Sequence, residues 1–226
     1  VRPTRDGIHG REFISTAVDI GEKPALLAFD ERGEPVGTVP KVITIQVPFL
    51  FDRPPRSARP RLLLEILARA AQEIESLTMV PVELVVRFNL AGPHVVPVVA
   101  EETWHWLGWL AWSPRMIALE GWDRERFAEL ERRFPESILC ARAPMESDVL
   151  ELVRQGARVL HLTADYHGRR NGRFVMDLIR QAHQRLVDAG LREQVTLIGS
   201  GGIVMAEHVP KAIICGLDAV ALDTAL

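Results

Sequence analysis

From residue 42 onward, apolar runs alternate with amphipathic stretches, and this rhythm constrains the fold more than any other feature of the sequence. Such alternation predicts parallel β-strands that are joined by helical crossovers. Eight strand candidates can be counted, which is the number that closes a (β/α)₈ barrel. They are residues 42–51, 82–88, 94–100, 115–119, 137–143, 159–164, 195–200 and 219–222.

Amphipathic stretches between these runs predict the crossover helices, because their apolar residues recur at helical spacing. One gap does not fit, since only residues 89–93 separate the second strand candidate from the third, too few for a parallel crossover. We therefore expect a TIM-type barrel that is partly irregular and that lacks its last helix. The helix candidates are residues 60–76, 102–112, 123–134, 146–155, 174–189 and 206–215.

The first 41 residues follow a different pattern. Strand-like segments at residues 13–20 and 25–29 precede the turn-forming sequence Asp30-Glu31-Arg32-Gly33, which predicts a β-hairpin. We expect two parts, an N-terminal β-hairpin extension over residues 1–41 and a barrel over residues 42–226. The chain begins at Val1 and ends directly after a strand candidate, so we also expect it to be part of a longer polypeptide.

Composition excludes several classes of function. A net charge of -3 gives no electrostatic reason to expect nucleic acid or a membrane surface as partner. No apolar stretch approaches the roughly 18 residues of a membrane span, and no signal segment opens the chain, so we expect a cytoplasmic protein. The sequence contains neither a nucleophile elbow nor a P-loop, which argues against hydrolases and nucleotide phosphohydrolases.

Metal chemistry has little support in the sequence. The chain has 2 cysteines, too few for the thiolates of an iron–sulfur cluster. No two histidines show the spacing of a helical metal site, so we expect no metal. His161 falls in the middle of a strand candidate, where we expect a histidine that is buried and hydrogen-bonded in the barrel interior.

Two consecutive strand ends predict a phosphate site. Ser200-Gly201-Gly202 follows one strand candidate and Asp223-Thr224-Ala225 follows the next. Glycines at a strand end let backbone N–H groups approach an anion, and the last two loops of a barrel commonly bind phosphate. A tight turn without a ligand is the alternative interpretation of the paired glycines.

The loop after residue 164 is the second place where we expect chemistry. Asp165 and His167 lie just past a strand end, where barrels carry acid–base groups. Arg169, Arg170 and Arg173 follow them and offer positive charge for an anionic substrate or a cofactor phosphate. The alternative is a solvated loop whose arginines only make surface contacts.

The last part of the chain resembles the FMN-binding domain of the glutamate synthase large subunit. The resemblance covers residues 137–226 and rests on four features whose order and spacing agree. They are the helix with Ala182-His183, the turn Gly190-Leu191-Arg192, the strand that ends in Gly201-Gly202, and the strand Gly216-Leu217-Asp218-Ala219 that leads to Thr224-Ala225.

This resemblance implies an FMN-dependent oxidoreductase that acts on a small molecule. It implies that Gly201-Gly202 and residues 223–225 hold the flavin phosphate. The family carries a lysine near the flavin on a strand in the middle of the barrel, and Arg142 stands at the matching place as a fixed cation. The family's three-cysteine segment is absent from this sequence, so other domains of a longer polypeptide would supply the electrons.

Two other functions are compatible with the same residues. A flavin-free isomerase, lyase or synthase would use the phosphate loops to hold a phosphorylated metabolite. A degenerate, non-catalytic barrel within a larger electron-transfer protein would keep the fold without the chemistry.

Overall fold

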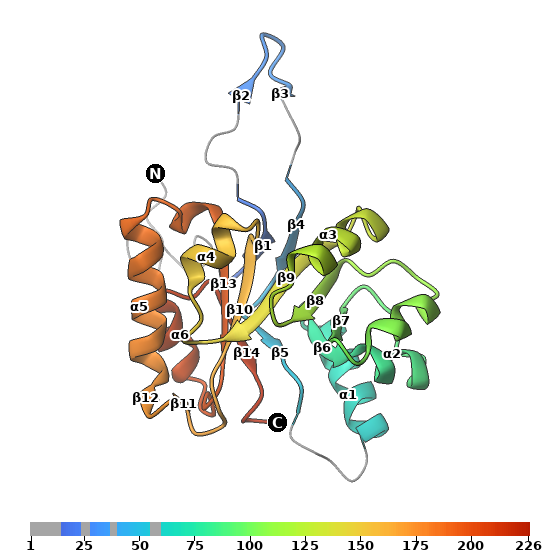
Figure 1. Cartoon of the computed structure of the whole chain (residues 1–226). Coiled ribbons are helices and arrows are strands. Elements are labelled where there is room, and N and C mark those ends of the chain that lie inside the picture. The colour runs from blue at the N-terminus through green and yellow to red at the C-terminus, as the bar shows by residue number, and fades with distance from the viewer. Residues whose placement is uncertain (1–14, 24–27, 37–39, 55–59) are drawn as a thin grey trace, which may run out of the picture.

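The computed structural model describes residues 15–23, 28–36, 40–54 and 60–226. Its centre is a closed barrel of eight strands (Figure 1). Every neighbouring pair in this barrel is parallel, and the last strand closes it by pairing with the first. In order around the barrel the strands are β5 (Phe49–Phe51), β6 (Thr78–Pro81), β7 (Val95–Val99), β8 (Met116–Glu120), β9 (Ile138–Pro144), β10 (Val159–Thr163), β13 (Thr196–Ser200) and β14 (Ala219–Leu222). The predicted (β/α)₈ barrel is thus confirmed.

Helices surround the strands, as Figure 1 shows. They cover the barrel with apolar faces, and in the long helix α5 the buried residues recur three or four apart. No described helix is long and apolar enough to cross a membrane. The helices are α1 (Pro60–Glu73), α2 (Val82–Phe88), α3 (Arg124–Arg133), α4 (Val149–Arg154), α5 (Val175–Asp188) and α6 (His208–Ile214), with the 3₁₀ helices η2 (Trp104–Trp109) and η3 (Arg192–Gln194). The helix predicted over residues 102–112 is only the short η2.

The strand predicted at residues 82–88 is wrong, because this segment is helix α2 and the second barrel strand is β6. Its valines suggested a strand, yet Val82 and Val85 are buried three residues apart, which is helical spacing. Asn89 ends the helix in the left-handed conformation, with a φ of 54°. Because α2 forms the crossover between β6 and β7, the short spacing between residues 88 and 94 no longer conflicts with a parallel barrel.

The run at residues 42–51 is two strands rather than one continuous strand. β4 (Val42–Ile45) lies outside the barrel and pairs antiparallel with β1 (Val18–Gly21), and the chain then bends into β5. Ile20, Ile43 and Ile45 of this ribbon are buried against the barrel interior. The ribbon therefore closes the end of the barrel opposite to the strands' carboxyl ends.

The far end of the hairpin projects away from the barrel in Figure 1. It consists of β2 (Ala28–Phe29) and β3 (Pro35–Val36), which pair antiparallel. The predicted turn between them is confirmed, with the Gly33 amide 3.0 Å from the Asp30 carbonyl oxygen. Residues 13–14 and 25–27 of the predicted strands lie outside the described residues. Two further short strands, β11 (Arg169–Arg170) and β12 (Arg173–Phe174), form a small hairpin before α5.

Side chains that point into the barrel change from apolar to polar toward the carboxyl end of each of two strands, β9 and β10. On β9 the inward positions carry Ile138, Cys140 and then Arg142, and on β10 they carry Val159 and then His161. The apolar residues form the middle of the barrel, whereas the polar ones gather at the carboxyl ends of the strands. This end of a barrel is where active sites lie.

Candidate functional site

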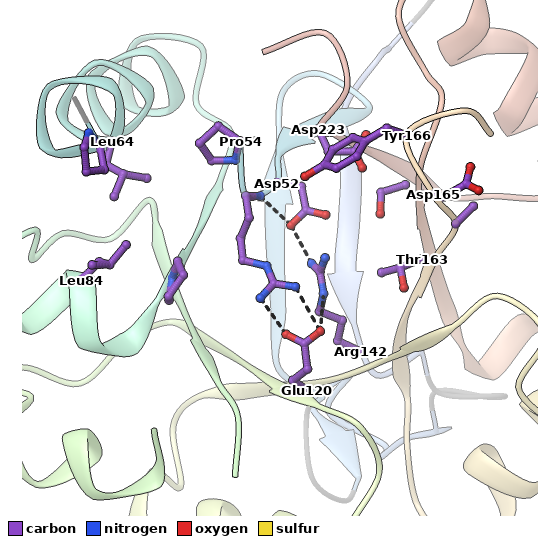
Figure 2. Close-up of a pocket in the computed structure, with 15 residues that line it drawn as sticks. Asp52, Pro54, Leu64, Leu84, Glu120, Arg142, Thr163, Asp165, Tyr166 and Asp223 are labelled. Carbon is purple, nitrogen blue, oxygen red and sulfur yellow. Dashed lines mark hydrogen bonds and ion pairs between the residues drawn. The ribbon is translucent and has the colours of Figure 1, made fainter. Parts of the chain in front are cut away.

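A cavity of about 710 Å³ opens at the carboxyl ends of the strands. In Figure 2, Leu64 and Leu84 lie on one side of it and Thr163 and Asp165 on the other. Its apolar lining includes Pro54, Pro60, Leu64, Pro81 and Leu84. Charged side chains lie between the two walls, so the cavity combines an apolar wall with a polar floor. This combination is typical of small-molecule sites.

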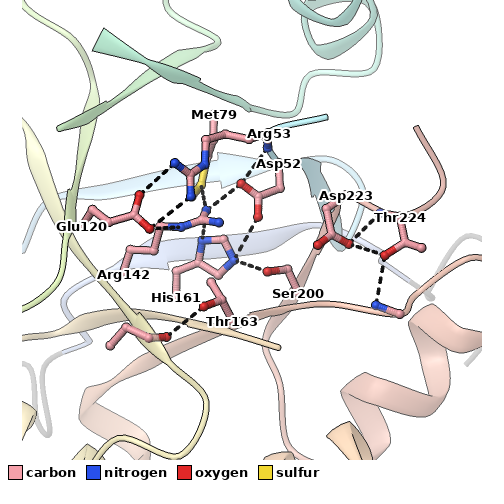
Figure 3. A network of polar contacts seen from close by, with 12 residues as sticks. Asp52, Arg53, Met79, Glu120, Arg142, His161, Thr163, Ser200, Asp223 and Thr224 are labelled. Atoms are coloured by element: carbon pink, nitrogen blue, oxygen red, sulfur yellow. Dashed lines mark hydrogen bonds and ion pairs between the residues drawn. The ribbon is translucent and has the colours of Figure 1, made fainter. Parts of the chain in front are cut away.

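Arg142 is the centre of the polar floor (Figure 3). Its Nη1 atom donates to Asp52 Oδ1 at 2.6 Å and lies 3.2 Å from His161 Nδ1. Its Nε atom lies 3.5 Å from Glu120 Oε1. Glu120 in turn accepts two contacts of 3.0 Å from the guanidinium of Arg53. Four charged side chains from three strand ends are therefore joined in one network.

Burial and neighbouring charge set the protonation states in this network. Burial favours a neutral Asp52, but the interactions with His161 and with the positive charge of Arg142 outweigh it and lower the pKa of Asp52 to about 2. Burial and the charge of Arg142 lower the pKa of His161 to about 3, so the imidazole is neutral at neutral pH. Arg142 is then the cation that pairs with Asp52. The pKa of Arg142 is raised, because the attraction of Asp52 outweighs burial.

The two predicted phosphate loops lie side by side. The Gly202 amide donates to Thr224 Oγ1 at 3.0 Å. Asp223 Oδ1 accepts from both the amide and the hydroxyl of Thr224, at 2.6 and 2.8 Å. Burial and the nearby charge of Asp52 raise the pKa of the Asp223 carboxyl. The amides of Gly202 and Thr224 are thus already bonded to side-chain oxygens.

Packing alone requires both glycines in the first of these loops. Gly201 and Gly202 have φ values of 110° and 69°, which other residues rarely adopt. A Cβ atom on Gly201 would come within 2.7 Å of Ala164, and one on Gly202 within 2.4 Å of the Gly168 backbone. These glycines are needed for the close approach of the loop that follows β10, whether or not a phosphate binds.

The loop after β10 places its two candidate residues differently. Asp165 lines the cavity, and its Oδ1 atom accepts from the amides of His167 and Arg169 at 2.9 and 2.8 Å, which stabilises the turn. His167 is exposed and does not line the cavity. Arg170 contacts Glu146 outside the cavity at 2.9 Å.

Of the predicted site residues, the structure brings four together in the cavity: Arg142, Asp165, Ser200 and Asp223. Three others, Gly201, Gly202 and Thr224, lie beside it, whereas His167 and Ala225 are exposed. Within the described residues, no group of His, Cys, Asp or Glu side chains is arranged to hold a metal ion.

Sequence reasoning missed Asp52, Arg53 and Glu120 as site residues. Asp52 and Arg53 directly follow β5, and Glu120 is the last residue of β8. The rule that barrel sites follow strand ends would have selected all three, had it been applied to every strand. His161 is buried and hydrogen-bonded as expected, with its Nε2 atom 3.0 Å from Ser200 Oγ.

Comparison with known proteins supports the sequence resemblance. Residues 169–226 match the family model described as the conserved region in glutamate synthase. A glutamate synthase large subunit-like protein of Rhizobium meliloti (strain 1021) is 31% identical over 106 residues. This match covers 46% of the chain and 23% of the relative, so the chain spans only about a quarter of that protein.

Solved structures with a similar fold include flavoenzymes. A flavocytochrome b2 mutant with benzoylformate superposes with a TM-score of 0.62 at 14% identity, covering 92% of this chain and 60% of that one. The flavin-binding domain of baker's yeast flavocytochrome b2 gives 0.57 at 13% identity, covering 92% and 61%. A lactate oxidase of Pediococcus acidilactici gives 0.53 at 14% identity, covering 81% and 64%. At these identities the likeness concerns the fold. The chain is therefore a TIM barrel whose residues 169–226 match the conserved region of glutamate synthase.

Proposed function

We propose that the cavity binds FMN and that the chain is the flavin domain of an oxidoreductase related to glutamate synthase. The observation that carries this proposal is the position of Arg142. It lies at the floor of the cavity on β9, the fifth barrel strand, where the resemblance places the cation beside the flavin. The flavin-containing barrels among the similar structures add support from the fold alone.

Two polar atoms at the floor that make no hydrogen bond fit the ring system of FMN. Asp52 Oδ2 and Arg142 Nε are buried and make no hydrogen bond within the described residues. Buried polar groups without a partner are unfavourable, so these two atoms favour a ligand that carries both a donor and an acceptor. The pyrimidine edge of an isoalloxazine has an N–H group between two carbonyl oxygens. The N–H would donate to Asp52 and a carbonyl oxygen would accept from Arg142.

The walls of the cavity also suit a flat aromatic ring. Leu64, Leu84 and Pro81 supply an apolar surface on one side. Opposite them, Tyr166 is half exposed at the cavity rim. Aromatic rings bury a large apolar area against such surfaces.

The loops after β13 and β14 could hold the FMN phosphate only if it displaced the Thr224 hydroxyl. The Gly202 amide is bonded to the Thr224 hydroxyl, so a phosphate oxygen would take the place of that hydroxyl. The neighbouring Asp223 would favour the phosphate only when protonated, since two negative charges repel. The raised pKa of Asp223 is in the direction that this requires.

Bound FMN would supply the redox chemistry. The chain's own residues would bind and orient it. Arg142 provides a fixed positive charge that favours negative charge on a ligand at the cavity floor. Asp52 holds the guanidinium in place through a buried bond of 2.6 Å.

Ligand-dependent thermal unfolding tests the proposal. FMN should raise the unfolding temperature of the purified protein in a concentration-dependent way, and it should do so more than riboflavin, which lacks the phosphate. The same shift should be small in Arg142→Met and unchanged in Arg170→Met, which alters a surface arginine outside the cavity. No shift with FMN in the unsubstituted protein would contradict the proposal.

One observation favours a second candidate, a flavin-free enzyme that acts on an uncharged or cationic metabolite. Four carboxylates line the cavity against two guanidinium groups, which makes it unfavourable for anions. The carboxylates are Asp52, Glu120, Asp165 and Asp223, and the guanidinium groups are Arg53 and Arg142. Stabilisation by small amines or polyols, without stabilisation by FMN, would support this candidate.

A further inference from the structure

We propose that His161 fixes the direction of the hydrogen bond at Ser200, so that the Ser200 hydroxyl donates to an acceptor atom of the ligand in the cavity. The identity of that ligand as FMN rests on the proposed function. The direction of the hydrogen bonds depends only on the described side chains.

Arg142 sets the direction of these hydrogen bonds. A guanidinium group carries only donors, and Arg142 Nη1 lies 3.2 Å from His161 Nδ1. The Nδ1 atom must therefore accept this hydrogen bond and carry no proton. The opposite tautomer would place two N–H groups against each other in a buried site.

The proton of the imidazole then lies on Nε2. A neutral ring with a bare Nδ1 has its N–H at the other nitrogen, and burial together with the charge of Arg142 keeps His161 neutral. The Nε2 atom lies 3.0 Å from Ser200 Oγ, within hydrogen-bond distance. Asp52 Oδ2 lies 3.7 Å away, beyond that distance. His161 therefore donates to Ser200.

Ser200 thus accepts from the imidazole and keeps its own proton free. Its Oγ atom has no other hydrogen bond within the part of the chain that the structure describes. Ser200 lines the cavity although only 1% of it is exposed, so an acceptor must come from the contents of the cavity. Together with Arg142 Nε, this hydroxyl provides a second donor at the floor. Flavin carbonyl oxygens and ring nitrogens are acceptors of the required kind.

The tautomer is testable without any ligand. Nitrogen-15 labelling of histidine distinguishes a protonated ring nitrogen from a bare one by NMR, and His161→Gln identifies the His161 signals by their loss. We expect a proton on Nε2 and none on Nδ1 at neutral pH. A proton on Nδ1, or on both nitrogens, would overturn the inference even if FMN binds.

FMN titrations test the consequence for binding. Ser200→Ala should weaken binding about tenfold, the effect of one buried hydrogen bond. His161→Leu should weaken it by a similar factor, because the hydroxyl would no longer be held as a donor. In His161→Gln the amide oxygen can accept from Arg142 and the amide N–H can donate to Ser200, so this variant should recover most of the affinity.

Two controls separate the inference from a general loss of structure. Thermal unfolding without ligand shows whether each variant is folded. His105→Leu makes the same substitution at an exposed histidine outside the cavity and should leave FMN binding unchanged. Equal losses in His161→Gln and His161→Leu, or full affinity in Ser200→Ala, would contradict the inference. If the unsubstituted protein does not bind FMN, the proposed function fails, and the NMR result alone decides the direction of the hydrogen bond.

Discussion

Asp52 and Arg142 form a buried ion pair that joins the first barrel strand to the fifth, with Arg142 Nη1 2.6 Å from Asp52 Oδ1. The side chains are only 1% and 8% exposed, so water contributes little to the solvation of either charge. Removing one partner from such a pair leaves the other charge buried and unpaired. This ion pair fixes the positions of the two side chains at the floor of the cavity.

We expect Asp52→Asn to lower the free energy of unfolding by about 3 kcal/mol, because Arg142 would lose its nearest counter-ion and keep only the longer contact with Glu120. The double variant Asp52→Asn/Arg142→Met should lose less than the two single variants together. Denaturant unfolding measures these differences. Glu65→Gln, which removes an exposed pair with Arg61, should have almost no effect. Additive losses in the double variant would mean that the pair is not coupled.

His161 should make stability dependent on pH. Its folded pKa of about 3 lies below its ordinary value of 6.5, so the unfolded chain takes up this proton first as pH falls. The contribution is complete above about pH 6.5 and is lost toward pH 3, with a slope of about 1.4 kcal/mol per pH unit. Asp52, whose pKa is lowered to about 2, loses its contribution only at lower pH.

The test compares denaturant unfolding at pH 6 and pH 5, above the range in which most carboxylates titrate. The unsubstituted protein should lose about 1 kcal/mol more across this interval than His161→Gln does. Equal slopes in the two proteins would show that His161 is protonated in the folded state.

Asp223 should oppose the binding of a phosphate at neutral pH. Asp223→Asn keeps the oxygen that accepts from the Thr224 amide and removes the negative charge. We therefore expect this variant to bind FMN about tenfold more tightly at neutral pH, with little change for riboflavin. Titrations that follow flavin absorption measure both affinities. Weaker FMN binding in Asp223→Asn would mean that the phosphate does not lie beside this carboxyl.

Gly202 should be intolerant of any side chain. Gly202→Ala would place a Cβ atom 2.4 Å from the Gly168 backbone at a φ of 69°, so we expect a loss of about 3 kcal/mol in the free energy of unfolding. Gly92→Ala is the matched control, since a Cβ atom there has no neighbour within 4 Å. Similar values for the two variants in denaturant unfolding would contradict the packing that is described for the 201–202 loop.

Much of the barrel could be predicted from the sequence because each strand and helix has a local periodicity. The prediction failed where local and long-range effects compete. Val82 and Val85 belong to a β-branched run, but the apolar surface beneath them selects a helix. The run at residues 42–51 is nearly continuous in apolar residues, and pairing with the antiparallel partner β1 separates its first half as β4.

The site was predictable only in part for a similar reason. Glycines at 201–202 and the polar residues after β14 mark strand ends, which a sequence displays directly. The pairing of Asp52 with Arg142 joins residues that are far apart in the chain and that meet only when the barrel closes. No local pattern reveals it. The Thr224 hydroxyl at the Gly202 amide depends equally on the register of β13 and β14.

The most direct measurement is an equilibrium titration of the purified protein with FMN, followed by the change in flavin absorption and repeated with Arg142→Met. We expect saturable binding of one FMN per chain with a shifted flavin spectrum. In Arg142→Met we expect binding at least about tenfold weaker, because the cation at the cavity floor is lost. An unchanged spectrum with the unsubstituted protein, or equal affinity in the two proteins, would contradict it.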